Sequence, residues 1–289
     1  MDRDYAAGAS GESGLVRIVA PNPSPMTAEG TNTYLIGTSD LAVIDPGPDL
    51  PGHLDALDRA IARRPVRAIL VTHAHLDHSP GARPLAMRTG APVLAFGPVL
   101  EGDAPAGIGG GEGMDRTFRP DRALAHGDVV RGDGWSLEAL HTPGHTRDHL
   151  SFLWPEAGAA FTGDIVMGWA STMISPPDGE LGAFLESLDR LERLDVETFH
   201  PGHGAPVADP AGRCRALRDH RAARTRTILA ALPQAPTIPQ LVAAIYQDTP
   251  PALHPAAARN VYAHLLHLAA AGQVRAAPGP APDASWSLA

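Results

Sequence analysis

The sequence predicts an α/β protein: a layered body of strands and helices followed by a small, mostly helical module. Short apolar runs of strand length, each bounded by Gly, Pro, Asp or Asn, dominate residues 15–210. Stretches with apolar residues at helical spacing lie between some of these runs, which favours an alternation of strands and helices. After about residue 210 the chain becomes rich in Arg and Ala. We therefore expect a disordered N-terminus over 1–14, a body over 15–210 and a separate module over 211–289.

Eight apolar runs in the body are expected to form strands. They span residues 15–20, 33–37, 41–45, 67–73, 91–97, 135–140, 149–154 and 159–164. Helices are expected over 53–64, 79–89 and 180–194, and the last of these carries an apolar stripe from Leu181 to Leu194. The segment 101–121 has many glycines and no period, so we expect a mobile surface loop. It lacks the lysine and the strand-to-helix setting of a phosphate-binding loop.

The C-terminal module is expected to hold three helices and two short strands. The helices are predicted over 211–232, 237–246 and 255–273, and the strands at VRAA (274–277) and WSL (286–288). Helices followed by a terminal two-stranded wing indicate a winged-helix module.

The composition excludes several kinds of chemistry. All 23 basic residues are Arg, so a Schiff-base lysine, a P-loop lysine and a lysine general base are ruled out. Cys214 is the single cysteine, which can form neither an internal disulfide nor a thiolate zinc site alone and fits a reducing compartment. No apolar run approaches the roughly 18 residues of a membrane span, and the N-terminus has no apolar leader segment. We expect a cytoplasmic protein without membrane contact.

The charge is distributed unevenly along the chain. The formal net charge of −9 argues against a surface built throughout to hold nucleic acid. Residues 211–289, however, carry 8 Arg and 3 Asp and are locally basic.

The stretch THAHLDHSPG concentrates metal-type ligands. The apolar run AILVT ends at Thr72 and leaves His73, His75, Asp77 and His78 on the loop that follows. Imidazole nitrogens and carboxylate oxygens are the usual ligands of a catalytic zinc site, and two adjacent ions would need about six or seven of them. More ligands must therefore come from elsewhere in the chain.

Three further candidates stand at the ends of strand-like runs. HTPGHT supplies His145, FTGDI supplies Asp164 and HPGHG supplies His203, each beside glycines that let the backbone turn sharply. A lone histidine is more often a surface or structural residue. Seven ligand-type residues at loop positions after separate strands instead predict a metal centre.

The motifs H-A-H-L-D-H, T-P-G-H-T, T-G-D and P-G-H-G, in this order, resemble those of the metallo-β-lactamase superfamily, whose fold is an αββα sandwich. The resemblance covers about residues 15–210. It implies two Zn²⁺ ions, with other divalent metals left open, and catalytic roles for Asp77 and Asp164. The implied ligands are His73, His75 and His145 on one ion, Asp77, His78 and His203 on the second, and Asp164 as the bridge between them.

Other residues near these motifs are expected to support the site. Asp45 in VIDPG matches the early Asp of the family, so we expect it to orient ligands; a plain turn residue is the alternative. His200 and His149 are expected to be structural or to contact ligands. Substrate contacts are predicted after Asp164, from Ser171, Thr172 and Ser175.

Within the superfamily, three segments are similar to the beta-lactamase-like protein 2 group. These are PNPSPMTAEGTNTYLIG, TPGHTRDHLSF and the helical tail after PGHG. Animal members of this group are described as single-strand endoribonucleases, so the resemblance implies that a metal-bridging hydroxide cleaves RNA phosphodiesters. The segment WASTMISPPDG departs from the animal proteins, which leaves the substrate open.

Three other functions also fit the sequence. The second hypothesis is a hydrolase of small acyl substrates, a thioester or a lactone, whose affinity would depend little on salt, whereas RNA binding would weaken steeply as salt rises. A mononuclear iron persulfide dioxygenase and a winged-helix nucleic-acid-binding regulator are the other two. We expect an RNA or small-molecule substrate, no protein partner and a dispensable Cys214, and we leave a homodimer open.

Overall fold

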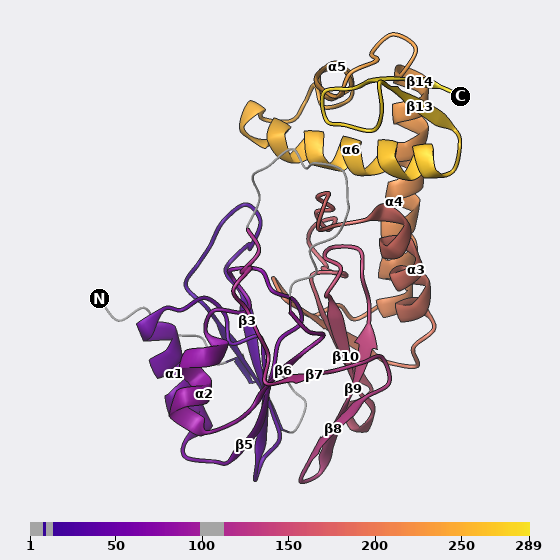
Figure 1. The fold of residues 1–289 in the computed structure, drawn as a ribbon. Helices are drawn as coiled ribbons and strands as arrows, with labels where there is room; N and C mark the ends of the chain where they lie inside the picture. The colour runs from indigo at the N-terminus through magenta and orange to yellow at the C-terminus, as the bar shows by residue number, and fades with distance from the viewer. Residues whose placement is uncertain (1–7, 10–13, 99–112) are drawn as a thin grey trace.

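The computed structural model describes residues 8–9, 14–98 and 113–289. The first half of the body forms a seven-stranded sheet in the order β1-β2-β3-β4-β5-β6-β7 (Figure 1). The strands are β1 (Gly8–Ala9), β2 (Leu15–Val19), β3 (Asn32–Ile36), β4 (Leu41–Ile44), β5 (Val66–Leu70), β6 (Val93–Ala95) and β7 (Arg122–Ala123). Strands β1 to β4 pair antiparallel, and β4 to β7 pair parallel.

The second half of the body forms a five-stranded sheet in the order β12-β11-β10-β9-β8. Its strands are β8 (Val129–Gly132), β9 (Trp135–His141), β10 (Leu150–Trp154), β11 (Ala159–Gly163) and β12 (Thr198–Pro201). All pairs are antiparallel except β11 with β12, because α3 (Leu181–Glu192) makes the crossover between these two strands.

The two sheets face each other across a shared apolar core. Tyr34 and Leu70 of the first sheet and Phe152 and Phe161 of the second are buried together there. Helices α1 (Pro51–Ile61) and α2 (Ala82–Thr89) cover the outer face of the first sheet, and α3 and the start of α4 cover the second. This layering is the αββα sandwich that the sequence predicted.

The C-terminal module packs around its own core. It contains the end of α4 (Pro210–Ala231), α5 (Ile238–Ile245), α6 (His254–Ala270) and the hairpin of β13 (Val274–Ala277) and β14 (Ser285–Leu288). Tyr262 and Trp286 are buried in this core at a ring distance of 6.3 Å. Helices with a terminal two-stranded wing are the arrangement expected from the sequence. Two short 3-10 helices, at 155–157 and 251–253, complete the described helical elements.

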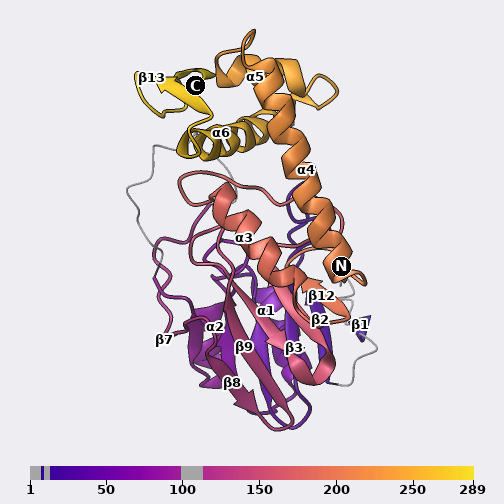
Figure 2. The ribbon, with the colours of Figure 1, turned by 90° about the vertical axis from the view of Figure 1, so that its right-hand side faces the viewer.

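Helix α4 belongs to both cores. Asp209 accepts a hydrogen bond from the Gly212 amide and Pro210 occupies the first turn, so the helix begins on the body. Cys214 and Leu217 are buried against α3, whereas Ile228 is buried in the C-terminal core. Figure 2 shows α4 running from the body to the level of α5 and α6. The predicted boundary at residue 210 therefore falls at the start of a helix that both parts share.

Several elements differ from the sequence expectation. The predictions did not include β7, β8 and β12, which are short strands with charged or polar residues in or beside them. Strands β5 and β6 and helix α2 are shorter than expected, since the predicted ranges included loop residues. Gly8–Ala9 pairs with β2 inside the segment expected to be disordered, and the rest of 1–13 lies outside the described residues. So does 99–112, which contains most of the predicted mobile loop.

A helix that crosses a bilayer must be long and apolar. Within residues 8–9, 14–98 and 113–289, no helix qualifies as a candidate membrane span.

Candidate metal centre

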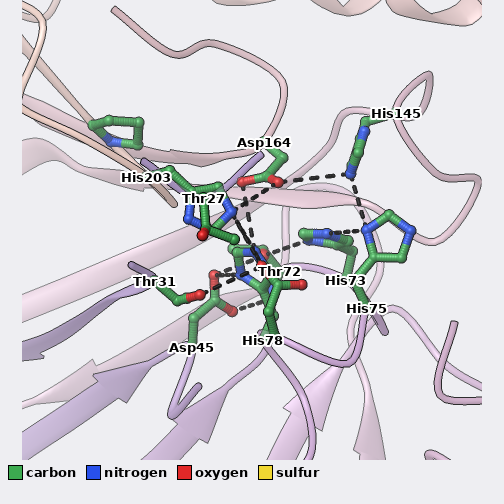
Figure 3. A network of polar contacts seen from close by, with 12 residues as sticks. Thr27, Thr31, Asp45, Thr72, His73, His75, His78, His145, Asp164 and His203 are labelled. Carbon is green, nitrogen blue, oxygen red and sulfur yellow. Dashed lines mark hydrogen bonds and ion pairs between the residues drawn. The ribbon is translucent and has the colours of Figure 1, made fainter. Parts of the chain in front are cut away.

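The seven predicted ligands follow strand ends of both sheets at one edge of the sandwich. His73, His75, Asp77 and His78 follow β5, His145 follows β9, Asp164 follows β11 and His203 follows β12. Figure 3 shows the side chains of His73, His145, Asp164 and His203 pointing toward one another. Three overlapping groups could each hold a metal ion: His73, His75 and His145; His73, His78 and Asp164; and Asp77, His78 and His203.

The first ligand group consists of three imidazoles. Nδ1 of His75 lies 2.9 Å from Nε2 of His73 and 3.0 Å from Nε2 of His145. Nδ1–H of His145 donates to the backbone carbonyl of Met173 at 2.7 Å. Because a carbonyl only accepts, Nδ1 of His145 carries a proton, and its Nε2 points into the group.

The second group combines two imidazoles with a carboxylate. Oδ2 of Asp77 lies 3.3 Å from Nε2 of His78 and 3.2 Å from Nε2 of His203. Nδ1–H of His203 donates to the carbonyl of Gly30 at 3.2 Å, so its Nε2 is also directed inward. All three ligands are buried.

Asp164 lies between the two groups. Its Oδ2 is 3.7 Å from Nε2 of His145 and 3.3 Å from Nε2 of His203, and its Oδ1 is 3.6 Å from Nε2 of His78. One carboxylate therefore faces ligands of both groups, which is the position that a bridging ligand requires.

The donor set fits divalent metal. Ring nitrogens face each other at 2.9 to 3.3 Å, and a cation between them would satisfy lone pairs that otherwise oppose one another. Oδ1 of Asp77 and Oδ1 of Asp164 are buried and accept no hydrogen bond from the described residues. Buried carboxylate oxygens without donors are costly unless a cation compensates them.

Asp45 orients ligands of both groups. Its Oδ2 accepts from Nδ1–H of His78 at 2.9 Å and from the Thr72 hydroxyl at 2.8 Å. That hydroxyl lies 2.9 Å from Nδ1 of His73 and can accept a hydrogen bond from Nδ1–H, so Thr72 connects the carboxylate to His73. Oδ1 of Asp45 accepts from the Thr72 amide at 2.7 Å. Asp45 has a φ of +50°, an uncommon conformation for a residue other than glycine, and this strain is located at the ligand support.

The electrostatics of the two groups differ. Burial and the neighbouring His145 lower the pKa of His75 to about 3, and burial also lowers that of His73. Burial acts in the same direction on His203, but the Asp164 carboxylate outweighs it and raises the pKa of His203 to about 10. His73 and His75 of the first group are therefore neutral imidazoles. Without metal, His203 is therefore protonated and pairs with the carboxylates of Asp77 and Asp164.

His149 and Asp148 support the ligand loops from the TRDH segment. Nε2 of His149 accepts from the Asp164 amide at 3.1 Å, and its ring stacks on His73 at 5.1 Å. Oδ2 of Asp148 accepts from the Ala74 amide at 3.0 Å, and burial raises the pKa of Asp148. The sequence analysis missed Asp148 and Thr72 because their partners are distant in the chain or are backbone atoms.

The HPGHG turn needs glycine for space. A Cβ atom on Gly202 would lie 2.3 Å from Oδ1 of Asp164 and 2.8 Å from Cε1 of His78. Asn32 of β3 holds this turn, since its side-chain amide donates to the carbonyls of Pro201 and Gly204, each at 2.9 Å. The two sheets thereby fix the position of His203 together.

The remaining predicted residues lie around the cluster. His200 packs between the rings of Tyr34 and Phe161, at 5.6 and 5.3 Å, and its contact with ligands stays a prediction. Thr172 is buried, and its hydroxyl donates to the carbonyls of Asp164 and Ile165, a structural contact. Ser171 is exposed and Ser175 is half-buried. The substrate contacts predicted for Ser171, Thr172 and Ser175 stay predictions.

His75 is half-buried, whereas the other six candidate ligands are buried. Leu76 follows His75 and is 49% exposed. Trp169 is 44% exposed. Its ring packs against Gly204, next to His203, so closely that a Cβ on Gly204 would lie 2.6 Å from it. One exposed apolar side chain thus follows His75 in the chain, and another lies at the turn that carries His203.

Two family descriptions match the chain. Residues 26–203 match the metallo-beta-lactamase superfamily, and residues 237–286 match the beta-lactamase associated winged helix domain. The first match covers the seven predicted ligands, and the second covers the C-terminal core elements from α5 to the wing.

Individual proteins resemble the chain over most of its length. A beta-lactamase-like protein 2 homolog of Drosophila melanogaster is 31% identical, over 91% of this chain and 90% of that protein. An atrochrysone carboxyl ACP thioesterase of Aspergillus chevalieri is 32% identical, over 75% of this chain and 65% of that protein. A metallo-beta-lactamase family protein of Thermus thermophilus shares the fold, with a TM-score of 0.74 and 24% identity over 96% of this chain and 99% of that one.

The fold, the ligand loops and these matches agree. The αββα sandwich carries the His/Asp cluster at the expected strand ends, and the winged helix follows it in the chain. The chain therefore belongs to the metallo-beta-lactamase superfamily of metal-dependent hydrolases and is similar to beta-lactamase-like protein 2.

Proposed function

We propose that the protein is a dinuclear zinc hydrolase that cleaves an acyl substrate of the thioester type. The single observation that carries the dinuclear site is Asp164, whose carboxylate faces His145 of one ligand group and His78 and His203 of the other. Imidazole and carboxylate without thiolate ligands suit a catalytic zinc pair, and other divalent metals remain alternatives.

The two ligand groups would each bind one metal ion. His73, His75 and His145 would hold one ion, and Asp77, His78 and His203 the other. When bound, the ions would activate a water molecule and stabilise the negative charge that develops on the attacked oxygen. Asp45 would keep Nδ1 protons on the rings that it supports, so that their Nε2 atoms remain ligands. No protein nucleophile is required.

The location of the basic residues weakens the case for RNA. Four of the eight arginines in 211–289 bind groups of the body instead of facing solvent alone. Arg215 and Arg218 form ion pairs with Glu192, and Arg213 and Arg221 donate to backbone carbonyls. Half of the arginines that suggested phosphate contacts are thus engaged in attaching α4 to the body. RNA cleavage stays a prediction that this arrangement does not favour.

Two observations support an acyl substrate. Leu76 and Trp169 place exposed apolar surface beside the two ligand groups, which suits an acyl chain better than a phosphodiester backbone. A relative that is 32% identical over three quarters of this chain is named a thioesterase. We propose a small-molecule substrate, and a homodimer stays open.

The test combines metal analysis with three substrates. Protein purified without added metal is analysed by mass spectrometry and assayed with an acyl N-acetylcysteamine thioester, a lactone and labelled single-stranded RNA. We expect about two zinc ions per chain and thioester cleavage that is lost in Asp77→Ala but kept in the exposed control Asp219→Ala. RNA cleavage alone would reject the acyl substrate. One iron per chain would reject the dinuclear zinc site and favour a persulfide dioxygenase.

A further inference from the structure

The segment 167–173 contacts His145 of the first group and Asp164, which lies between the groups, through its backbone and one hydroxyl. It follows Asp164 and has no regular secondary structure. The Thr172 hydroxyl donates to the carbonyl of Asp164 at 2.8 Å, and the carbonyl of Met173 accepts from Nδ1–H of His145 at 2.7 Å. The orientation of both ligands therefore depends on where this segment lies.

Two arginines of α4 hold the other side of the same segment. Arg213 donates from Nε to the carbonyl of Met167 at 2.7 Å and from Nη2 to that of Ala170 at 2.6 Å. Arg221, two helical turns later, donates from Nη2 to the carbonyl of Thr172. Hydrogen bonds from a charged donor are strong, and a guanidinium fork fixes direction as well as distance.

Arg221 also contacts the C-terminal module. Its Nη1 donates to Oδ1 of Asn260 in α6 at 3.1 Å, and its guanidinium lies 5.3 Å from the ring centre of Phe184 in α3. The side chain is 2% exposed. Burial lowers the pKa of Arg221 to about 10, which still leaves it charged at neutral pH. A buried charge is a poor source of stability compared with an apolar residue of similar volume, so its value here lies in geometry.

We propose that Arg213 and Arg221 are positioning residues that fix segment 167–173, and through it the orientation of His145 and Asp164. Arg221 would thereby link the winged helix to the metal centre by way of Asn260. The proposal rests on the metal site of the proposed function and is independent of the substrate class.

The test uses Arg221→Met, with Arg218→Met as the matched control. Arg218 lies on the same helix but pairs with Asp189 and Glu192 on α3, and among the described residues it forms no hydrogen bond or ion pair with the segment. We expect Arg221→Met to bind metal about tenfold more weakly, measured by competition with a chelating dye, while Arg218→Met keeps the wild-type affinity. With saturating metal, kcat should fall more than KM changes.

Two further variants locate the effect. Arg221→Lys restores the charge but not the fork, so it should recover only part of the affinity. Thr172→Val removes the hydroxyl that reaches Asp164, and its effect should be less than additive with Arg221→Met because both act through one segment.

The outcomes are distinct. If Arg221→Met lowers thermal stability but binds metal as the wild type does, or if Arg218→Met loses as much affinity, the proposal is overturned. Should Arg221→Met fail to fold, the half-buried Arg213→Met decides by the same criteria. Failure of the wild-type chain to bind metal would instead reject the proposed function.

Discussion

At the scale of the residue, Asp45 connects the two ligand groups outside the metal centre. It reaches His78 directly and His73 through Thr72, so one carboxylate fixes a ring in each group. Its left-handed backbone is tolerated because three hydrogen bonds from His78 and Thr72 define the position of the carboxylate.

Asp45→Asn should weaken metal binding about 10- to 100-fold, because the amide cannot accept from both His78 and Thr72 with the same strength. The matched control is Asp40→Asn, another buried aspartate, whose partners are Arg67 and Trp135 far from the cluster. That control should lower the melting temperature without changing metal affinity. Metal titration of both proteins makes the comparison, and equal affinity losses would contradict the role of Asp45.

Gly202→Ala should lower metal content sharply while the fold remains, because the added methyl would lie 2.3 Å from Oδ1 of Asp164. Gly279→Ala is the control, since a Cβ there meets nothing within 4 Å. Metal per chain and circular dichroism are measured together. Full metal content in Gly202→Ala would show that the turn can move away.

Metal binding should release protons. The pKa of His203 is raised to about 10 by Asp164, so in the metal-free protein this ring is protonated at pH 7 and must lose a proton before its Nε2 binds metal. Affinity should therefore increase as pH rises toward 10. Calorimetric titrations in buffers of different ionisation enthalpy should give about one proton or more per chain at pH 7. A value near zero would contradict the protonated state.

The candidate ligands that the fold brings together could be identified from the sequence, whereas most of the residues that support them could not. The ligands occur in short motifs beside glycines, and this local pattern is visible without a structure. Thr72, Asp148 and Gly202 act on residues that only folding brings close to them. Thr172 was expected to contact substrate, but its buried hydroxyl donates to backbone carbonyls.

At the scale of the element, α4 shows why the domain boundary is difficult to predict. Its composition resembles that of a solvated helix, yet Cys214, Leu217 and Arg221 are buried on the body side. The long strands of the body were predicted well because apolar runs identify them. The short strands β7, β8 and β12 depend on pairing with neighbours, so sequence pattern alone does not reveal them.

Cys214→Ala should keep full metal content and activity and cost about 1 kcal/mol of stability through the small cavity. Burial raises the pKa of the Cys214 thiol to about 12, so almost no thiolate exists at pH 8. A thiol reagent should therefore label the native protein only slowly at pH 8 and rapidly once it is unfolded. Fast native labelling, or loss of activity in a folded variant, would contradict a purely structural cysteine.

At the scale of the whole molecule, the metal centre joins the two halves of the sandwich. Its candidate ligands come from loops of both sheets, so a metal ion bound there would hold the two sheets together as well as prepare the site.

Removing the metal should lower the melting temperature by several degrees, since a ligand at 1,000 times its Kd stabilises the native state by about 4 kcal/mol. Thermal unfolding with and without a chelator measures this. Asp77→Ala, which lacks one ligand of the second group, should show a smaller difference. An equal difference in both proteins would mean that the second group does not bind.

The sharing of α4 between two cores also restricts how this chain can change over generations. Arg221 and Ile228 are seven residues apart, yet Arg221 binds the segment that contains Thr172, whereas Ile228 packs in the C-terminal core. A lineage that lost its winged helix would expose the second half of α4 and release Arg221 from Asn260, so it would have to rewrite the helix at the same time. Replacing either module would therefore require changes in α4 as well.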